Sequence, residues 1–381
     1  MNLLPPTLVP APVRIIGTGL IGGSLGLALT TAGVDVQVED VSPGTTALAV
    51  EMGVGSVAGP DSPDPALVLV AAPPDVTAAI VARALREWPD ALVADVASVK
   101  GEILAQLRQQ CTPIELTRYV GAHPMAGREV SGVIAAQGDL FTGRPFVVVP
   151  HSGTKPEAVT TMRALGTELG SVVRVMDASA HDEAVAHVSH VPQVMASLLA
   201  ATLLEPDAAA LDLAGQGVRD ATRIADSDPR LWVEILGANA AAVAPVLDSI
   251  RDRLGDVIEA LDACRAEARD AAPSAPGNGP VPRRTVASVI ADGNRGVSRI
   301  PGKHGGAGDD FATLVVVIPD RPGALASLLA AIQEIGVNLE DLHLEHALGR
   351  RVGLTHIAVE QEHEEHLTQE LITRGWTVAG R

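Results

Sequence analysis

The first 180 residues combine two patterns of apolar positions: short runs that are apolar throughout, and longer stretches in which apolar residues recur at helical spacing. The run 66–72 is the clearest of the first kind, and Pro73 and Pro74 end it. A strand that is apolar on both faces belongs in a parallel sheet covered by helices on both sides. Because such runs alternate with helical stretches, the pattern predicts an α/β fold with a doubly wound parallel sheet. Strands are expected at 13–16, 34–38, 66–72, 91–96, 119–122, 146–150 and 172–176. One helix is expected between the first strand and Gly33, and further helices are expected at 45–52, 76–88, 102–110 and 156–169.

The pattern changes twice further along the chain. From 179 to 271 the periodic stretches are helical and rich in Ala and Leu, which predicts an all-helical second domain. Residues 272–311 are rich in Gly and Pro, which indicates a linker with one short helix around 286–290. From 312 to 381 the order strand, helix, strand, strand, helix, strand predicts a small ferredoxin-like βαββαβ unit. The expected domains are therefore 1–178, 179–271 and 312–381, with 272–311 as the linker.

The first strand runs into a glycine-rich turn of the form GxGxxG, which opens a helix. In such a turn the first glycine makes the bend, the second lets the backbone approach a pyrophosphate, and the third allows close packing of helix on strand. The N–H groups at the helix N-terminus then face the phosphates. Asp40 follows the second strand, where a carboxylate hydrogen-bonds a ribose diol and repels a 2′-phosphate, so 1–178 is expected to be a Rossmann domain that binds NAD rather than NADP. The residues expected at the cofactor are Gly17, Thr18, Gly19, Leu20, Ile21, Gly22 and Asp40.

Four further positions fall at the carboxyl ends of predicted strands, where ligands bind in such sheets. Ala72 and Pro73 end the third strand and Ser98 follows the fourth, so all three are expected beside the cofactor. His123 follows the fifth strand, and as a neutral imidazole it could accept the proton of a substrate hydroxyl while hydride leaves the same carbon. The alternatives are that His123 is a turn residue without chemistry, and that Ser98 caps the helix beginning near Glu102 instead of bonding the hydroxyl.

The helical domain offers histidines and an arginine as ligand-binding candidates. His187 and His190 resemble a metal-binding pair only in their spacing, because no third ligand is obvious and Pro192 interrupts the helix, so no metal is expected. Arg223 could direct its guanidinium at a carboxylate, or it could form a surface ion pair.

Composition narrows the class of protein. The net charge of −18 argues against nucleic acid and anionic membranes as partners. Two cysteines, Cys111 and Cys264, indicate neither a disulfide framework nor a zinc site. The N-terminal stretch has no basic region typical of a signal peptide, and the longest nearly apolar run, 194–204, is too short to cross a bilayer. We therefore expect a soluble, cytoplasmic protein.

Six segments together resemble a known family. They are GTGLIGGSL, AAPPD, DVASVK, GAHPMAG, HDEAVAHVSHVP and DATRIADSDPRLW, and they lie within residues 13–262. In order and separation they resemble prephenate dehydrogenase of tyrosine biosynthesis. The C-terminal VVVIPDRPGALASLLAAI, followed by GVNLEDLHLEH, resembles an ACT domain, an amino-acid-sensing module. The resemblance implies a homodimer formed through the helical domain, oxidative decarboxylation of prephenate to 4-hydroxyphenylpyruvate with NAD, and feedback by tyrosine.

The resemblance also implies roles for individual residues. His123 matches the catalytic histidine, and Ser98 matches its hydroxyl partner near the nicotinamide. His190 and Arg223 match residues that bind substrate carboxylates.

Other matched positions surround this arginine or depart from the family pattern. Asp220 and Trp232 match supporting residues near the arginine, and Glu129 matches an acidic residue at the pocket entrance. Gln193 stands where a histidine is often found, and Arg128 where a small polar residue is common. These departures leave prephenate and arogenate open as substrates.

Two other readings remain open. A dehydrogenase of the β-hydroxyacid type also joins a Rossmann domain to a helical domain, but such enzymes usually carry a lysine on a helix of the second domain, and 179–270 contains no Lys. The other is a non-catalytic sensor of NAD and an amino acid, in which His123 and Arg223 would be relics.

Overall fold

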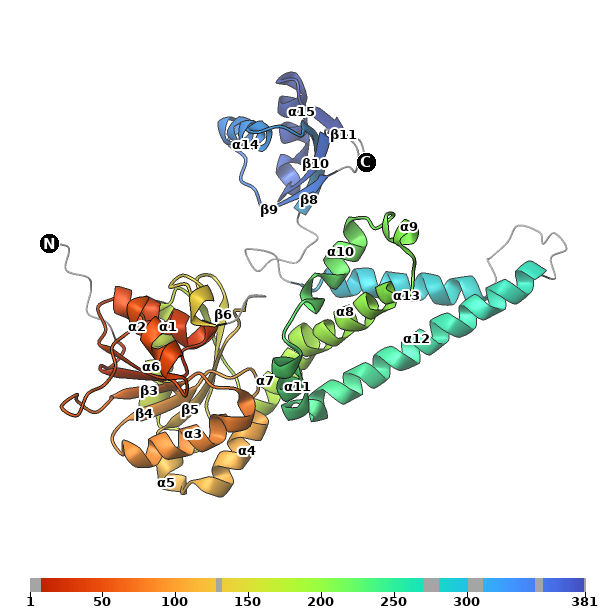
Figure 1. Cartoon of the computed structure of the whole chain (residues 1–381). Coiled ribbons are helices and arrows are strands. Elements are labelled where there is room, and N and C mark those ends of the chain that lie inside the picture. Colours follow the sequence, from red (N-terminus) through yellow and green to blue (C-terminus); the bar gives the residue numbers. More distant parts are fainter. Residues whose placement is uncertain (1–7, 128–131, 270–280, 301–310, 347–351, 380–381) are drawn as a thin grey trace. The chain divides into compact units, whose positions relative to one another are not determined.

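The computed structural model describes residues 8–127, 132–269, 281–300, 311–346 and 352–379. They form two compact units, Met1–Ser249 and Ile250–Arg381. The first unit holds a seven-stranded sheet followed by helices. The second holds the end of a long helix, the helix α13 (Val281–Val297), and a four-stranded sheet that carries the helices α14 (Ala324–Ile335) and α15 (Glu364–Thr373) (Figure 1). Because the boundary falls inside the long helix, the expected helical domain 179–271 is divided between the two units.

The sheet of the first unit has the strand order β2-β1-β3-β4-β5-β6-β7. Strands β1 to β5 are parallel, which confirms the doubly wound parallel sheet. Strand β6 runs antiparallel to β5, and β7 pairs with β6 in parallel. The chain leaves β1 first to one side and then to the other, so the topological switch point lies between β1 and β3. The strands are β1 Val13–Ile16, β2 Val36–Glu39, β3 Leu67–Val70, β4 Leu92–Asp95, β5 Tyr119–Pro124, β6 Pro145–Val149 and β7 Val172–Val175.

Helices cover both faces of this sheet, and each face has its own core (Figure 1). On one face Leu25, Leu29 and Met162 are buried, and on the other Leu85 and Leu107 are buried. Burial of both faces explains why β3 reads as an unbroken apolar run. The first face is covered by α1 Leu20–Thr31, α2 Pro43–Glu51 and α6 Pro156–Glu168, and the second by α3 Pro74–Glu87, α4 Gly101–Gln110 and the short α5 Pro113–Leu116.

The turn between β1 and α1 is as tight as its glycines predict. Gly17 has a φ of 95°, and a Cβ there would lie 2.3 Å from the carbonyl oxygen of Ala71. A Cβ on Gly22 would lie 1.9 Å from the carbonyl oxygen of Gly17, so α1 can begin this close to β1 only because residue 22 has no side chain. A Cβ on Gly19 would meet no atom within 4 Å, which leaves its backbone open to a ligand.

A long helical run follows the sheet, and it contains a π-helix. The run consists of α7 Ala178–Val185, the π-helix Ala186–His190 and α8 Val191–Ala201. Pro192 does not break the helix as the sequence suggests. It lies in the first turn of α8, directly after the wider π turn, where its missing N–H is tolerated.

By length and composition alone, the run Ala178–Leu204 could cross a membrane, and the bent pair Pro229–Ala238 and Ala240–Ala266 could form a second span. Core helices of soluble proteins pass the same test. His181 and His190 are buried on this run and hydrogen-bonded to other elements of the first unit, and 33% of the apolar stretch is buried.

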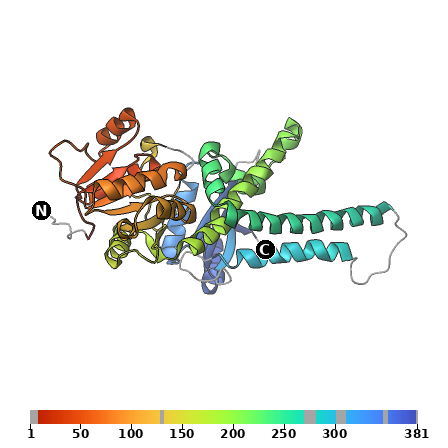
Figure 2. The same ribbon diagram turned by 90° about the horizontal axis from the view of Figure 1, so that it is seen from below.

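The expected linker contains a longer helix than its glycines and prolines suggest. The helices after α8 are α9 Ala208–Leu211, α10 Gln216–Thr222, α11 Pro229–Ala238, α12 Ala240–Arg269 and α13 Val281–Val297. Helix α13 has 17 residues instead of one short turn around 286–290. Pro282 is tolerated because it lies in the first turn. In Figure 2, α12 and α13 lie side by side, and Arg253 of α12 is 3.6 Å from Asp292 of α13.

The C-terminal sheet confirms the βαββαβ order. Its elements are β8 Phe311–Pro319, α14 Ala324–Ile335, β9 Asp341–His346, β10 Val352–Glu360, α15 Glu364–Thr373 and β11 Thr377–Ala379. The strands pair antiparallel in the order β11-β8-β10-β9. Leu328 and Leu367 of the two helices are fully buried against Val316 and Ile357 of the sheet.

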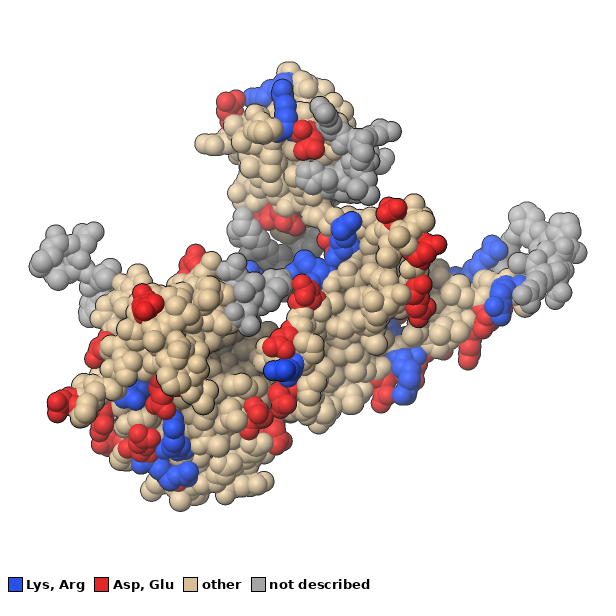
Figure 3. All heavy atoms as spheres, in the orientation of Figure 1, with Lys and Arg blue, Asp and Glu red and all other residues tan. Residues whose placement is uncertain are grey.

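The described side chains on the face drawn in Figure 3 show Lys and Arg interspersed with Asp and Glu. None of the elements visible on that face carries a continuous basic surface among its described residues.

Candidate active site

A cavity of about 870 Å³ lies at the carboxyl ends of the parallel strands of the first unit. One wall is the sheet edge, with the glycine turn, the segment after β3, Ser98 and His123. The opposite wall belongs to the helices, with His190 of the π-helix and Trp232 of α11. The cavity therefore occupies the place where ligands bind in open α/β sheets.

The residues expected at the cofactor surround one end of this cavity. Those that line it are Gly19, Leu20, Ile21, Ala72, Pro73 and Ser98. Gly17 and Gly22 shape the turn. Asp40 lies at the end of β2, where its carboxylate accepts hydrogen bonds from the amide of Thr18 at 2.8 Å and from the hydroxyl of Thr18 at 3.1 Å. An accessible Gly19 backbone and a carboxylate fixed beside the turn suit a dinucleotide with an unmodified ribose.

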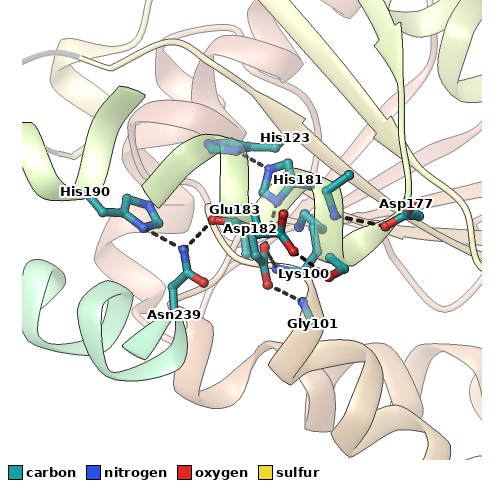
Figure 4. Close-up of polar contacts among 12 residues, drawn as sticks. Lys100, Gly101, His123, Asp177, His181, Asp182, Glu183, His190 and Asn239 are labelled. Carbon is teal, nitrogen blue, oxygen red and sulfur yellow. Dashed lines mark hydrogen bonds and ion pairs between the residues drawn. The ribbon is translucent and has the colours of Figure 1, made fainter. Parts of the chain in front are cut away.

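His123 begins a chain of hydrogen bonds that leads away from the cavity (Figure 4). It lies within β5, close to the end of that strand, and its Nδ1 is 2.9 Å from Nε2 of His181 on α7. Nδ1 of His181 is 2.7 Å from Oδ1 of Asp182. All three residues are buried.

Asp182 is held by the start of a helix from the sheet domain. Its Oδ1 accepts a hydrogen bond from the backbone N–H of Lys100 at 2.9 Å, and its Oδ2 accepts one from Gly101 at 2.7 Å. These are free amides at the N-terminus of α4, where a negative charge is favoured. Burial alone would raise the pKa of Asp182, but the hydrogen bonds from His181, Gly101 and Lys100 outweigh it, and the pKa is lowered.

The chain fixes the tautomer of His123. The ionised Asp182 can only accept, so Nδ1 of His181 carries a proton. With His181 neutral, its Nε2 is an acceptor, and the proton between the two rings belongs to Nδ1 of His123. Nε2 of His123 is then the basic nitrogen. Burial lowers the pKa of His123 well below its ordinary value, and His181, Lys100 and His190 lower it further, so the ring is neutral at pH 7.

His190 reaches the same cavity from the π-helix. Its Nδ1 is 3.0 Å from Nδ2 of Asn239, the residue between α11 and α12 (Figure 4). The ring of Trp232 stands edge-on to it, with 6.0 Å between the centroids. Burial lowers the pKa of His190 to about 4, against the opposing effect of Asp182.

A buried ion pair lies close to His123. Nζ of Lys100 bonds Oδ1 of Asp95, and the hydroxyl of Tyr119 donates to Oδ2 of Asp95 at 2.7 Å. The side chains of Lys100 and Asp95 are 1% and 0% exposed, so this pair is sealed from solvent. A Cβ on Gly121 would lie 2.8 Å from Cδ of Lys100, which means that the lysine runs directly against β5. Burial lowers the pKa of Lys100, and Asp95 partly offsets the effect.

Some residues expected at the site lie elsewhere. Arg223 begins a short turn after α10 and lines a neighbouring cavity of about 560 Å³ together with Arg144. The two cavities share the wall formed by Met125, Ala126 and Gly127. Asp220 is exposed and accepts a hydrogen bond from Gln216.

Of the two positions that depart from the family pattern, the structure describes Gln193. Gln193 is buried, lines neither cavity, and donates to the hydroxyl of Ser227 at 2.7 Å. Glu129 and Arg128 lie outside the described residues. The alternative role of Ser98 as a helix cap is wrong, because α4 begins at Gly101 and its first amides bond Asp182.

Sequence reasoning missed His181, Asp182, Asn239 and Lys100. The available signal was a polar residue on an apolar face: His181 and Val185 are four residues apart on α7, and both are buried. No spacing rule could show that α7 packs against the start of α4, because those residues are about 80 positions apart in the chain.

The described residues contain one group of side chains close enough to hold a metal ion, formed by Glu360, Glu362 and His363. It is largely exposed and belongs to the C-terminal unit. His187 and His190 do not form the metal pair that their spacing resembles, since His187 is exposed with its Nδ1 at 3.2 Å from the carbonyl of Glu183, whereas His190 is buried.

Comparison with known proteins agrees with this geometry. Residues 25–175 match the family model described as prephenate dehydrogenase, nucleotide-binding domain, and residues 177–270 match prephenate dehydrogenase, dimerization domain. The chain is 34% identical to the probable prephenate dehydrogenase NovF of Streptomyces niveus, over 95% of this chain and 98% of that protein.

Two solved structures are also similar. The prephenate dehydrogenase of A. aeolicus in complex with hydroxyphenyl propionate and NAD+ has a TM-score of 0.63 and 26% identity, over 76% of this chain and 99% of that one. The arogenate dehydrogenase of Synechocystis has a TM-score of 0.59 and 25% identity, over 75% of this chain and 99% of that one.

Proposed function

Because the chain belongs to the prephenate dehydrogenase family and is an NAD-binding oxidoreductase, we propose that it converts prephenate to 4-hydroxyphenylpyruvate by oxidative decarboxylation. The observation that carries this proposal is the chain His123–His181–Asp182, which begins in the cavity beside the glycine turn. Oxidation of an alcohol needs a base oriented at the hydroxyl, next to the hydride acceptor.

The chemistry follows from the position of His123. Nε2 of His123 takes the proton of the hydroxyl on C4 of the substrate, and Ser98 hydrogen-bonds the same oxygen. NAD held at the glycine turn by Gly19, Leu20 and Ile21 would supply the acceptor for the hydride that leaves C4. The bond from C1 to its carboxylate then breaks, CO2 leaves, and the electron pair makes the ring an aromatic phenolate. His123 returns the proton to the phenolate oxygen, so the base is regenerated and no net proton is released.

The second and third members of the chain stabilise the protonated base. When Nε2 of His123 is protonated the ring becomes an imidazolium, and its Nδ1–H bonds His181. The charge of Asp182 acts through His181, and the amides of α4 keep Asp182 ionised. The protein therefore provides an oriented acceptor for the proton.

We assign the substrate carboxylates to the helical wall. His190 and Trp232 face the cavity directly. Arg223 lies on the adjoining cavity, where it would bind a carboxylate that extends past the wall at Met125 to Gly127. A substrate with two carboxylates suits a site with cationic and hydrogen-bonding groups in two adjoining hollows.

Arogenate is the competing substrate, because an arogenate dehydrogenase is among the similar structures. The test is to measure NADH formation with prephenate and with arogenate, in parallel, at a fixed enzyme concentration. We expect kcat/KM to be much higher for prephenate, and higher with NAD than with NADP. The reverse substrate preference would assign the chain to arogenate oxidation.

We also propose that 312–381 is an ACT domain that binds tyrosine and inhibits the enzyme. The supporting observation is a pair of turns at the two ends of α14, where Gly323 has a φ of 84° and Gly336 a φ of 81°. Turns of this kind leave backbone groups beside helix ends for the amino and carboxyl groups of an amino acid.

A homodimer through the helical region completes the proposal. The family model for 177–270 is that of a dimerization domain. Leu254, Ile258 and Leu261 of α12 recur at spacings of four and three residues, and each is more than half exposed. An apolar stripe of this kind on a surface helix marks a surface for association.

A further inference from the structure

Asn239 connects His190 to the backbone of Asp182. Its Nδ2 donates to the backbone carbonyl of Asp182 at 2.9 Å and lies 3.0 Å from Nδ1 of His190 (Figure 4). The side chain is 3% exposed, so water does not replace either contact. Asn239 ends α11, whereas Asp182 lies on α7 and His190 on the π-helix.

The carbonyl of Asp182 settles the orientation of the amide. A carbonyl oxygen accepts hydrogen bonds only, so the atom that faces it must be the NH2 group of Asn239. The same NH2 group faces Nδ1 of His190, which must then be an acceptor and carry no proton. A neutral imidazole with an unprotonated Nδ1 has its proton on Nε2.

We propose that Asn239 is a positioning residue that holds His190 as the neutral Nε2–H tautomer, so that His190 donates a hydrogen bond to a substrate carboxylate. The proposal rests on the function proposed above in one respect, namely that the substrate carries a carboxylate at His190. A donor that is neutral at rest binds the carboxylate equally well across neutral pH, since no proton is taken up or released. Asn239 also joins this donor to the backbone of the residue that orients the base.

Other charged groups near His190 do not fix its tautomer. The titratable groups that act on it are Asp182 and His181 of α7, and those that share its cavity are His123 of β5 with Asp228, Arg230 and Glu234 of the α11 region. Asn239 provides the hydrogen bond to Nδ1 of His190, and Trp232 provides the ring contact.

The first experiment needs no substitution. The full-length protein with 15N-labelled histidine is studied by NMR at neutral pH, and the signals of His190 are assigned by their loss in His190→Gln. We expect an unprotonated Nδ1 and a protonated Nε2. A protonated Nδ1, in either the other tautomer or the imidazolium, overturns the proposal.

The second experiment is Asn239→Asp, which replaces the NH2 group by an acceptor of the same shape. The carboxylate of the variant favours a proton on Nδ1 of His190. Nε2 of His190 can then donate to the substrate only while the ring is an imidazolium. When the ring is neutral, Nε2 has a lone pair instead of a proton and repels the substrate carboxylate. We expect the KM of the variant to rise on the order of ten-fold between about pH 6 and pH 8, while the KM of the parent stays nearly constant. The pH profile of kcat should be the same in variant and parent. Parallel KM profiles for parent and variant overturn the proposal.

Gln193→Glu is the matched control, because it also turns a buried amide into an acid but contacts Ser227 instead of a histidine. Its KM should keep the pH profile of the parent. Failure of the proposed function can be distinguished from failure of the proposal for Asn239. If arogenate is oxidised and prephenate is not, the named substrate is wrong. The same measurements with arogenate, which also carries carboxylates, then still test the role of Asn239.

Discussion

His123 and His187 are two histidines of the first unit with opposite surroundings, which makes them a matched pair for mutation. His123→Asn should keep NAD binding but lower turnover by roughly two to four orders of magnitude, the usual contribution of a positioned acid or base. His187→Asn should leave turnover unchanged, because His187 is exposed and does not line the cavity. Steady-state rates of NADH formation decide the matter, and normal turnover in His123→Asn would remove this residue from the mechanism.

Asp182→Asn tests whether the negative charge behind His123 supports the base. The amide removes that charge, and its NH2 group must face a backbone N–H at the start of α4, either that of Lys100 or that of Gly101. We expect kcat to fall by roughly 10²- to 10⁴-fold with little change in NAD affinity. A kcat within a few-fold of the parent would show that the chain is structural only.

The lowered pKa values of His123 and His190 set the response to acid. Both rings are neutral when folded, and the unfolded chain takes up protons near pH 6.5. Because the unfolded state binds more protons in this window, the free energy of unfolding should decrease as pH falls from about 6.5 towards 4. Activity at saturating substrate should persist below pH 6.5 and be lost only at lower pH. Urea unfolding at several pH values measures this pH dependence of the free energy of unfolding. The same measurement with His190→Gln shows how much of the pH dependence comes from His190.

At the scale of the element, the turn between β1 and α1 separates a packing role from a binding role. Gly22→Ala places a Cβ 1.9 Å from a backbone oxygen and should reduce the free energy of unfolding by about 1–3 kcal/mol, even without cofactor. Gly19→Ala meets open space and should leave that free energy unchanged while weakening NAD binding. Denaturant unfolding measures the free energy of unfolding of both variants, and titration with NAD measures their affinity for the cofactor. An equal loss of stability in both variants would contradict the assignment of a packing role to Gly22 and a binding role to Gly19.

The elements themselves were largely predictable, for a reason that β3 and α13 illustrate. The apolar run of β3 has one physical explanation, a strand buried on both faces, and the structure confirms it. Helix α13 was missed because Gly293, Gly296 and Pro282 indicate a loop, whereas the structure forms a helix of 17 residues there with Pro282 in its first turn. The preferences of single residues are a weak guide that the wider context can override.

The site was predictable only up to the residues that the sheet positions. His123 and Ser98 follow from the rule that ligands bind at the carboxyl ends of parallel strands. His181 and Asn239 come from helices whose packing on the sheet no periodicity reveals, and the reversed direction of β6 was equally invisible because a strand reads the same in either direction.

At the scale of the whole molecule, regulation and catalysis should be separable. A chain that ends at Asp309 lacks the C-terminal sheet but keeps the first unit and α13. We expect it to stay active and to lose inhibition by tyrosine, because the proposed effector site lies beyond residue 311. Initial rates of both forms across a tyrosine series test this. Equal inhibition of both forms would place the inhibitor in the active site.

The sealed Lys100–Asp95 pair has a consequence for chemical labelling. The chain has three lysines, Lys100, Lys155 and Lys303, and Lys155 is exposed whereas the side chain of Lys100 is 1% exposed. Amine-reactive reagents acylate only accessible, uncharged amines, so Lys100 can react only while the sheet edge around it is open. The acylation rate of Lys100, measured from the mass of its peptide with Lys155 as internal reference, therefore reports how often the cofactor domain opens. NAD should slow the acylation of Lys100 in proportion to the stability that NAD binding adds.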